Sequence, residues 1–168
     1  KITDDMAKKV VRELKTNNTN LLSQYVHPDW GVRIMPSIWR SDSDQVFSLA
    51  QVKSLAKSNK IYNWGSDSGN LEDGADASIR ETWTQFLHNY LYTHNFANSR
   101  DILYNTITKP DGGVNTLKKD YPDAILVRYY MPGSPNEIDW KELWLIWQRT
   151  SKGNDWYLLG IGYKVWSP

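Results

Sequence analysis

The chain contains no cysteine, almost no excess charge of either sign and no long apolar run. The absence of cysteine excludes disulfides, thiolate nucleophiles and iron–sulfur clusters. The 20 Lys and Arg residues nearly balance the 19 Asp and Glu residues, and a net charge of +1 argues against a nucleic-acid partner. The longest apolar run, residues 143–147, is much shorter than a membrane span requires. We therefore expect neither a transmembrane segment nor a nucleic-acid partner.

The length and the aromatic content predict one folded domain over residues 1–168. A chain of 168 residues is long enough to bury a substantial core, and too short for more than one typical domain. Nine Trp and ten Tyr residues with so little net charge are not a disordered composition. Because the chain begins at Lys1 rather than at Met, we expect that a preceding segment has been removed.

Helical periodicity dominates the first half of the chain. Apolar residues recur every three or four positions, and polar or turn-forming stretches separate these segments. The pattern predicts helices at residues 3–16, 19–25, 48–58 and 78–93. Residues 31–38 and 60–64 are predicted to be extended, and residues 65–76 form a loop rich in Gly, Ser and Asp.

The last third of the chain is typical of strands. Residues 124–131, 140–149 and 155–166 are rich in aromatic and β-branched residues. Residues 140–149 also fit a helical stripe, but their run of consecutive apolar residues would bury both faces of a strand. The polar sequence 151–154 is a turn that joins two such runs into a hairpin. Helices followed by long strands predict an α+β fold.

No catalytic residue, metal ligand or cofactor motif is assigned. The three histidines lack the spacing of a metal-binding pair, and the glycines do not form a nucleotide-binding loop. In the sequence 65–69 the central residue is Asp67, not the Ser of a nucleophile elbow. For His27 we expect a structural role at a helix end, although an acid–base role beside Asp29 is an alternative. The glycines of residues 160–162 indicate a bend or bulge within a strand.

The aromatic residues of the last strands are the strongest functional indication. In a strand, Trp144 and Ile146 lie on one face while Trp147 lies on the other. One face packs on the helices, so aromatics on the outer face need a ligand, a partner or another segment to cover them. Arg128 interrupts an apolar strand, where we expect it to snorkel to the surface or to pair with a carboxylate; in a pocket it would recognise an anion. The predicted ligand-binding residues are Arg128, Tyr129, Trp144, Trp147 and Trp156. A core filled by aromatic side chains is the alternative.

Two stretches carry a resemblance to a known fold family. Residues 22–32 read Leu-x-x-x-Val-His-Pro-x-x-Gly-Val, and residues 156–161 read Trp-Tyr-Leu-Leu-Gly-Ile. With the order of elements, they resemble the nuclear transport factor 2-like fold, which includes the ketosteroid isomerases. The resemblance implies N-terminal helices packed on a strongly curved, cone-like antiparallel sheet. Residues 25–32 and 140–161 are also similar to uncharacterised domains of exported Gram-positive bacterial proteins, which implies an extracellular or cell-envelope location.

Three functions remain open at this point. The leading hypothesis is a non-enzymatic domain of an exported bacterial protein that binds a small molecule, a glycan or a protein. The first alternative is a small isomerase or dehydratase of the ketosteroid isomerase type, for which Asp139 and Glu142 are the candidate bases. The second is a carbohydrate- or cell-wall-binding module that uses exposed Trp and Tyr rings. A homodimer formed through the open face of the sheet is also compatible with the sequence.

Overall fold

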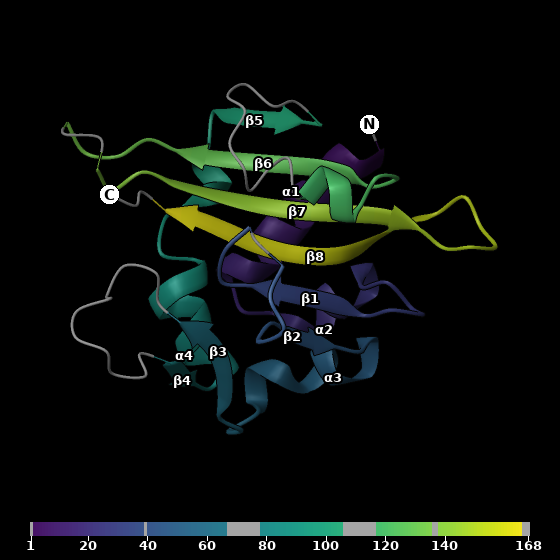
Figure 1. Cartoon of the computed structure of the whole chain (residues 1–168), viewed down its shortest axis with the longest axis horizontal. Coiled ribbons are helices and arrows are strands. Elements are labelled where there is room, and N and C mark those ends of the chain that lie inside the picture. The colour runs from purple at the N-terminus through teal and green to yellow at the C-terminus, as the bar shows by residue number, and fades with distance from the viewer. Residues whose placement is uncertain (1, 39, 67–77, 106–116, 136–137, 166–168) are drawn as a thin grey trace.

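The protein is an α+β fold built around one six-stranded sheet (Figure 1). The computed structural model describes residues 2–38, 40–66, 78–105, 117–135 and 138–165. The strand order in the large sheet is β2-β1-β8-β7-β6-β5, and β3 and β4 form a separate two-stranded sheet. The strands are β1 (Val32–Met35), β2 (Gln45–Phe47), β3 (Tyr62–Ser66), β4 (Ser78–Glu81), β5 (Asp101–Tyr104), β6 (Ile125–Met131), β7 (Lys141–Arg149) and β8 (Trp156–Val165).

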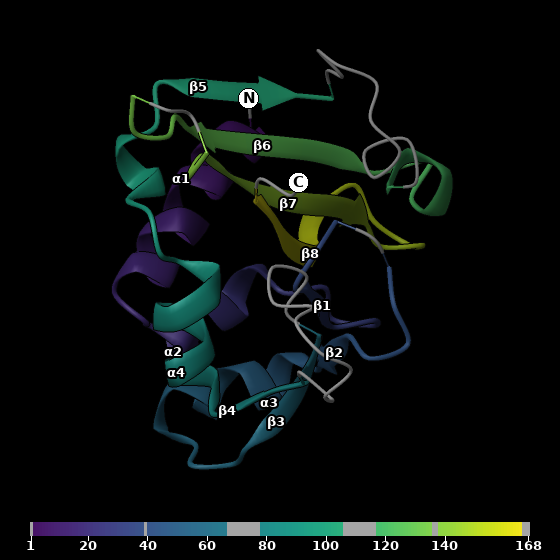
Figure 2. The same cartoon turned by 60° about the vertical axis from the view of Figure 1, so that its left-hand side comes forward.

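The N-terminal helices pack against one face of the large sheet, which confirms the predicted fold class (Figure 2). The longest helix, α1, buries the apolar stripe that its sequence predicts. Ser48 begins the third helix with a capping box, in which its side chain and that of Gln51 bond each other's backbone N–H. The helices are α1 (Ile2–Lys15), α2 (Thr19–Leu22), α3 (Leu49–Ser54) and α4 (Trp83–Phe86), with short 3-10 turns at Ser23–Tyr25 and Leu55–Lys57.

One pairing of the large sheet is parallel, so the sheet is mixed and not wholly antiparallel as the resemblance implies. Strand β1 runs parallel to β8, while the other neighbouring strands of the sheet are antiparallel in the described residues. The β7–β8 hairpin, which residues 140–166 predict, occupies the centre of the sheet. β1 and β8 are more than a hundred residues apart in the sequence, so no hairpin turn joins them. This pairing places β1 between β2 and the central hairpin.

Strand β8 contains the predicted irregularity next to Gly160. Its register against β7 shifts between Ile146 and Trp147, so that Leu159 is an additional residue in β8. A Cβ atom on Gly160 would lie 3.0 Å from Cδ1 of Ile146 and 3.2 Å from Cε of Met35. The glycine therefore allows the strand to pack closely at the point where the sheet bends.

The helix predicted at residues 78–93 begins later than its periodicity indicates. Residues Ser78–Glu81 form strand β4, which pairs with β3, and Thr82 begins the helix with a capping box. The helix continues through a π-helical turn at Leu87–Leu91. The prediction was wrong at residues 78–81 because strand pairing with a distant segment overrides local periodicity. The predicted loop at 65–76 lies almost entirely outside the described residues.

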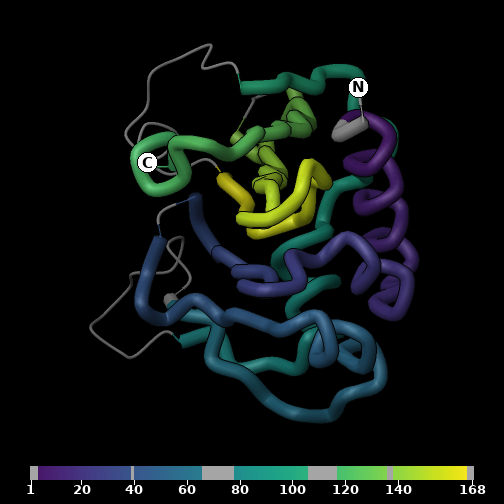
Figure 3. Tube along the Cα trace, turned by 90° about the vertical axis from the view of Figure 1, so that its right-hand side faces the viewer, coloured from purple at the N-terminus to yellow at the C-terminus, as the bar shows by residue number. Residues whose placement is uncertain are grey.

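The sheet separates two apolar clusters, one on each face. On the helix-facing side, a large cluster contains Trp64, Trp83, Phe86 and Trp147, none more than 1% exposed. On the outer side, a smaller cluster is covered by the segment 117–124, which begins with a helical turn (Figure 3). Its buried members are Met35, Ile38, Leu117, Leu126, Trp144 and Ile146. The outer face is thus covered in part by the chain itself. No helix within the described ranges is long and apolar enough to cross a membrane.

Candidate functional site

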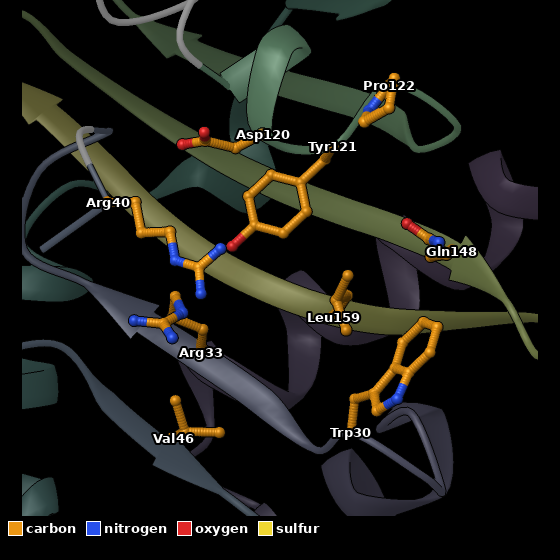
Figure 4. Close-up of a pocket in the computed structure, with 9 residues that line it drawn as sticks. All are labelled: Trp30, Arg33, Arg40, Val46, Asp120, Tyr121, Pro122, Gln148 and Leu159. Atoms are coloured by element: carbon orange, nitrogen blue, oxygen red, sulfur yellow. The ribbon is translucent and has the colours of Figure 1, made fainter. Parts of the chain in front are cut away.

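A cleft of about 320 Å³ lies on the outer side of the sheet, beside the smaller apolar cluster (Figure 4). Its residues come from the turn before β1, from β1, β2, β7 and β8, from the connection between β1 and β2, and from the segment that covers the outer face. They are Trp30, Arg33, Arg40, Val46, Asp120, Tyr121, Pro122, Gln148 and Leu159. We refer to this feature as the outer cleft.

Two guanidinium groups occupy one end of the outer cleft (Figure 4). Nη1 of Arg33 lies 3.3 Å from Oδ2 of Asp44 and donates to the carbonyl oxygen of Ser41. Both contacts use Nη1, and Nη2 and Nε of Arg33 bond no acceptor among the described residues. Arg40 is exposed and forms no ion pair within 4.0 Å with the described part of the chain. This end of the cleft therefore offers N–H donors to an acceptor that carries negative charge.

The same basic end holds a buried carboxylate that balances one of the two positive charges. Burial raises the pKa of Asp44, while the hydrogen bond from the backbone N–H of Ser41 and the charge of Arg33 act to lower it. As the carboxylate side chain is only 2% exposed, Asp44 holds Arg33 in place from beneath the cleft. Arg40 is the cation without such a partner among the described residues.

Tyr121 lies beside the two arginines at the basic end and is held by the covering segment (Figure 4). Its backbone N–H donates to the carbonyl oxygen of Leu117, whose side chain is buried in the outer cluster. Figure 4 shows the phenol ring directed toward Arg40. Burial raises the pKa of Tyr121, and the positive charges of Arg33 and Arg40 partly oppose this effect. At neutral pH the phenol is thus an uncharged donor beside two cations.

Trp30 stands at the opposite end of the outer cleft (Figure 4). Its indole stacks on the ring of His27 with a centroid distance of 4.5 Å and an interplanar angle of 7°. Trp30 is nevertheless 53% exposed, because His27 covers only one of its faces. The turn is closed by Gly31, which has a φ of 71° and donates its N–H to the carbonyl oxygen of His27. The turn thus presents a large aromatic surface to solvent.

His27 is completely buried, and hydrogen bonds occupy both of its ring nitrogens. Nδ1 accepts from the backbone N–H groups of Asp29 and Trp30, at 3.2 and 3.1 Å. Nε2 therefore carries the proton, and it lies 3.3 Å from the carbonyl oxygen of Arg149. The contacts favour the structural role over the acid–base role, because neither nitrogen faces the cleft as a free group.

Leu159 and Gln148 form the floor and one side of the cleft. Leu159 is the additional residue of the β8 irregularity, and it packs against the outer apolar cluster. Gln148 lies near the end of β7, at the same end of the cleft as Trp30 (Figure 4). Its side-chain amide has no hydrogen-bond partner among the residues that the structure describes. It is therefore a free donor and acceptor beside the exposed indole.

The five residues predicted to bind a ligand do not form one site. Arg128 and Trp144 are cross-strand neighbours on the outer face. Arg128 forms ion pairs with Asp101 at 3.1 Å and with Glu142 at 3.4 Å, which confirms that it pairs with a carboxylate. Nε1 of Trp144 donates to Glu142 at 2.8 Å. Trp144 is only 3% exposed because the covering segment packs on it.

The other three predicted residues lie away from this pair. Tyr129 and Trp147 are buried on the helix-facing side, where the Tyr129 hydroxyl and the Trp147 indole N–H lack hydrogen-bond partners within the described chain. Burial raises the pKa of Tyr129. Trp156 is half-buried, with the guanidinium of Arg149 4.7 Å from its ring centroid. None of the five lines the outer cleft, and their role in binding stays a prediction.

The two carboxylates considered for isomerase chemistry lie in different settings. Burial raises the pKa of Glu142, but its carboxylate is bound by Arg128 and Trp144. Asp139 is exposed and accepts a hydrogen bond from the backbone N–H of Ser134, which lowers its pKa. Neither residue lines the outer cleft.

Reasoning from sequence did not find the outer cleft. Its parts come from segments more than a hundred residues apart, which the parallel β1–β8 pairing and the packing of the segment 117–124 bring together. Trp30 was the one available indication, as a large aromatic between Pro28 and Gly31 in a turn cannot easily be buried. No group of three or more metal-ligating side chains is found within the described segments. No protein-family model matches the chain, and no curated protein or solved structure matches it either.

Proposed function

We propose that this chain is a non-enzymatic ligand-binding domain that holds a small anionic molecule in the outer cleft. The observation that carries the proposal is the convergence of Arg33, Arg40 and Tyr121 opposite an exposed Trp30. Arginine forks and a neutral phenol bind anionic groups, and an open aromatic face binds a ring. As part of the same proposal, the domain belongs to an exported bacterial protein and has the cone-like fold that the resemblance implies.

The packing of the helix-facing side supports a ligand site on the outer face. In a cone-like fold the space between helices and sheet is the expected place for a ligand. Here that space is occupied by large side chains, and the ring of Trp64 stacks on Phe86 at a centroid distance of 4.1 Å. The outer cleft, by contrast, has the volume of a small ligand pocket, which is roughly 300–1,000 Å³.

A thermal-shift screen tests this proposal. The purified chain is heated with small anions, aromatic acids, acidic and neutral sugars, steroids and calcium, at two protein concentrations. A ligand at about 100 times its dissociation constant adds roughly 2.7 kcal/mol to the free energy of unfolding, which raises the melting temperature by several degrees. We expect anionic ligands to give the shift, and the Arg40→Ala and Trp30→Ala variants to lose it.

The control is Arg80→Ala, which removes an exposed arginine of β4 that does not line the cleft. This variant should retain the full shift. A ligand that still raises the melting temperature of both Arg40→Ala and Trp30→Ala would contradict the proposal, because it would bind elsewhere. A melting temperature that depends on protein concentration and on no ligand would favour a homodimer instead.

A further inference from the structure

We infer that the ligand of the outer cleft is an acidic sugar of one or two rings, bound through its carboxylate at the arginines and through a ring face on Trp30. The inference rests on the proposed function and names the class of its ligand. Three features of the cleft lead to it: the charge at one end, the indole at the other, and the polar group beside the indole.

The charge at the basic end fits a single carboxylate better than a doubly charged phosphate. Arg33 and Arg40 contribute two positive charges, and the buried Asp44 compensates one of them. Asp120 also lines the cleft, but it forms no ion pair with Arg40 within 4.0 Å in the described chain. The basic end can therefore balance a ligand with one negative charge, while the carboxylate of Asp120 disfavours a second negative charge on the ligand.

The indole of Trp30 provides a platform for a sugar ring. His27 holds one face of the indole parallel to its own ring, so the side chain keeps its orientation without a ligand. The exposed opposite face matches the flat, weakly polarised C–H face of a pyranose. Because the side chain is already ordered, binding costs less side-chain conformational entropy.

The amide of Gln148 distinguishes a sugar from an aromatic acid. A sugar that stacks on Trp30 carries hydroxyl groups around the edge of its ring, where the free amide of Gln148 can donate to them and accept from them. An aromatic acid of the same size would cover this amide without bonding it, which costs binding free energy. The volume of about 320 Å³ limits the enclosed part to one or two rings.

Isothermal titration calorimetry on the full chain tests the inference with four probes. They are cellobiouronate, which carries one carboxylate on two sugar rings, its neutral counterpart cellobiose, naphthalene-1-acetate and inorganic phosphate. Cellobiouronate should bind at least tenfold more tightly than each of the other three. This expectation follows because only cellobiouronate supplies a single carboxylate, a ring face and hydroxyl groups together.

Substitutions then assign each contact. Arg40→Gln should weaken the binding of cellobiouronate about 10- to 100-fold and leave that of cellobiose nearly unchanged, because the lost bonds involve a charged acceptor. Gln148→Leu should weaken the binding of cellobiouronate about two- to tenfold, but not that of naphthalene-1-acetate. Asp120→Asn should strengthen the binding of cellobiouronate about two- to fivefold by removing repulsion. Arg80→Gln and Asp123→Asn are matched surface controls outside the cleft, and both should bind normally.

The outcomes separate this inference from the proposed function. If naphthalene-1-acetate or phosphate binds in an Arg40-dependent way and cellobiouronate does not, the outer cleft is a ligand site but the acidic-sugar inference is wrong. If cellobiouronate binds equally well to Arg40→Gln and to Trp30→Ala, the sugar site lies elsewhere and the inference also fails. If none of the four probes binds, the inference is overturned, while the thermal-shift screen decides the proposed function independently.

Discussion

At the residue scale, burial changes the pKa of one lysine, Lys141. The residue is 2% exposed, and its ammonium lies 4.3 Å from the ring centroid of Tyr163. Nζ donates to the carbonyl oxygen of Tyr90 and to Oγ1 of Thr93. It forms no ion pair within 4.0 Å with the described residues. Since no carboxylate offsets the loss of hydration, burial lowers the pKa of Lys141 to about 8.

The lowered pKa predicts a pH dependence of stability that Lys141→Met removes. Above about pH 8 the folded chain has released this proton, while the unfolded chain keeps it up to its ordinary pKa of 10.5. The free energy of unfolding therefore rises between pH 8 and 9.5, by at most roughly 1.4 kcal/mol per pH unit. Urea unfolding at several pH values measures this slope for both proteins.

The control is Lys118→Met, which replaces an exposed lysine and should leave the slope unchanged. Burial also lowers the pKa of Lys164 and contributes in the same direction, so the informative quantity is the difference in slope. Equal slopes for the original chain and for Lys141→Met would show that Lys141 is not deprotonated in this range.

At the scale of elements, the turn between the first helices and β1 decides whether the outer cleft exists. Gly31 has a φ of 71°, a conformation that L side chains rarely adopt. A Cβ atom at this position would also collide with the carbonyl oxygen of Phe47, the last residue of β2. The glycine therefore fixes the turn that carries Trp30 and lets β1 and β2 approach it.

Gly31→Ala should consequently lower the free energy of unfolding by about 2 kcal/mol or more, through backbone strain and the collision. It should also abolish ligand binding at the cleft by moving Trp30. The matched control is Gly153→Ala, where the nearest atom is the flexible Oγ1 of Thr150 at 2.9 Å and the φ is not positive. Chemical denaturation measures the free energy of unfolding of both variants. If Gly31→Ala were as stable as Gly153→Ala, the turn would not require a glycine at position 31.

At the scale of the whole molecule, one sheet stabilises two apolar clusters and thereby couples them. β7 contributes Leu143, Leu145 and Trp147 to the helix-facing cluster and Trp144 and Ile146 to the outer one. This alternation along the strand is the one that the sequence predicts. Because both clusters depend on the same strand, we expect neither to persist when the other is lost.

The chain should therefore unfold in one cooperative transition. In a guanidinium titration, tryptophan fluorescence and far-ultraviolet circular dichroism should give coincident curves, as a single domain of this size usually does. Two separate transitions would contradict this expectation and would show that one part of the chain unfolds independently of the rest. A Trp144→Phe variant removes one fluorescent tryptophan from the outer face alone. It should leave the two curves coincident.

The sequence by itself determined the class of fold, most of the elements and the two faces of the central strand. These features depend on local periodicity, capping residues and strand alternation, which neighbouring residues encode. It did not determine the short strand at residues 78–81, because that strand exists only through its pairing with β3. The short edge strands β2 and β5 likewise depend on the strands beside them.

Only the tertiary structure decided where the candidate site lies. The parallel pairing of β1 with β8 brings Arg33 beside the β8 irregularity, and the segment 117–124 places Tyr121 over both. The same segment covers Trp144, which sequence patterns alone could equally assign to a ligand site. Contacts between distant segments are set by the packing of the whole chain. The local sequence of a segment therefore does not determine which distant residue that segment contacts.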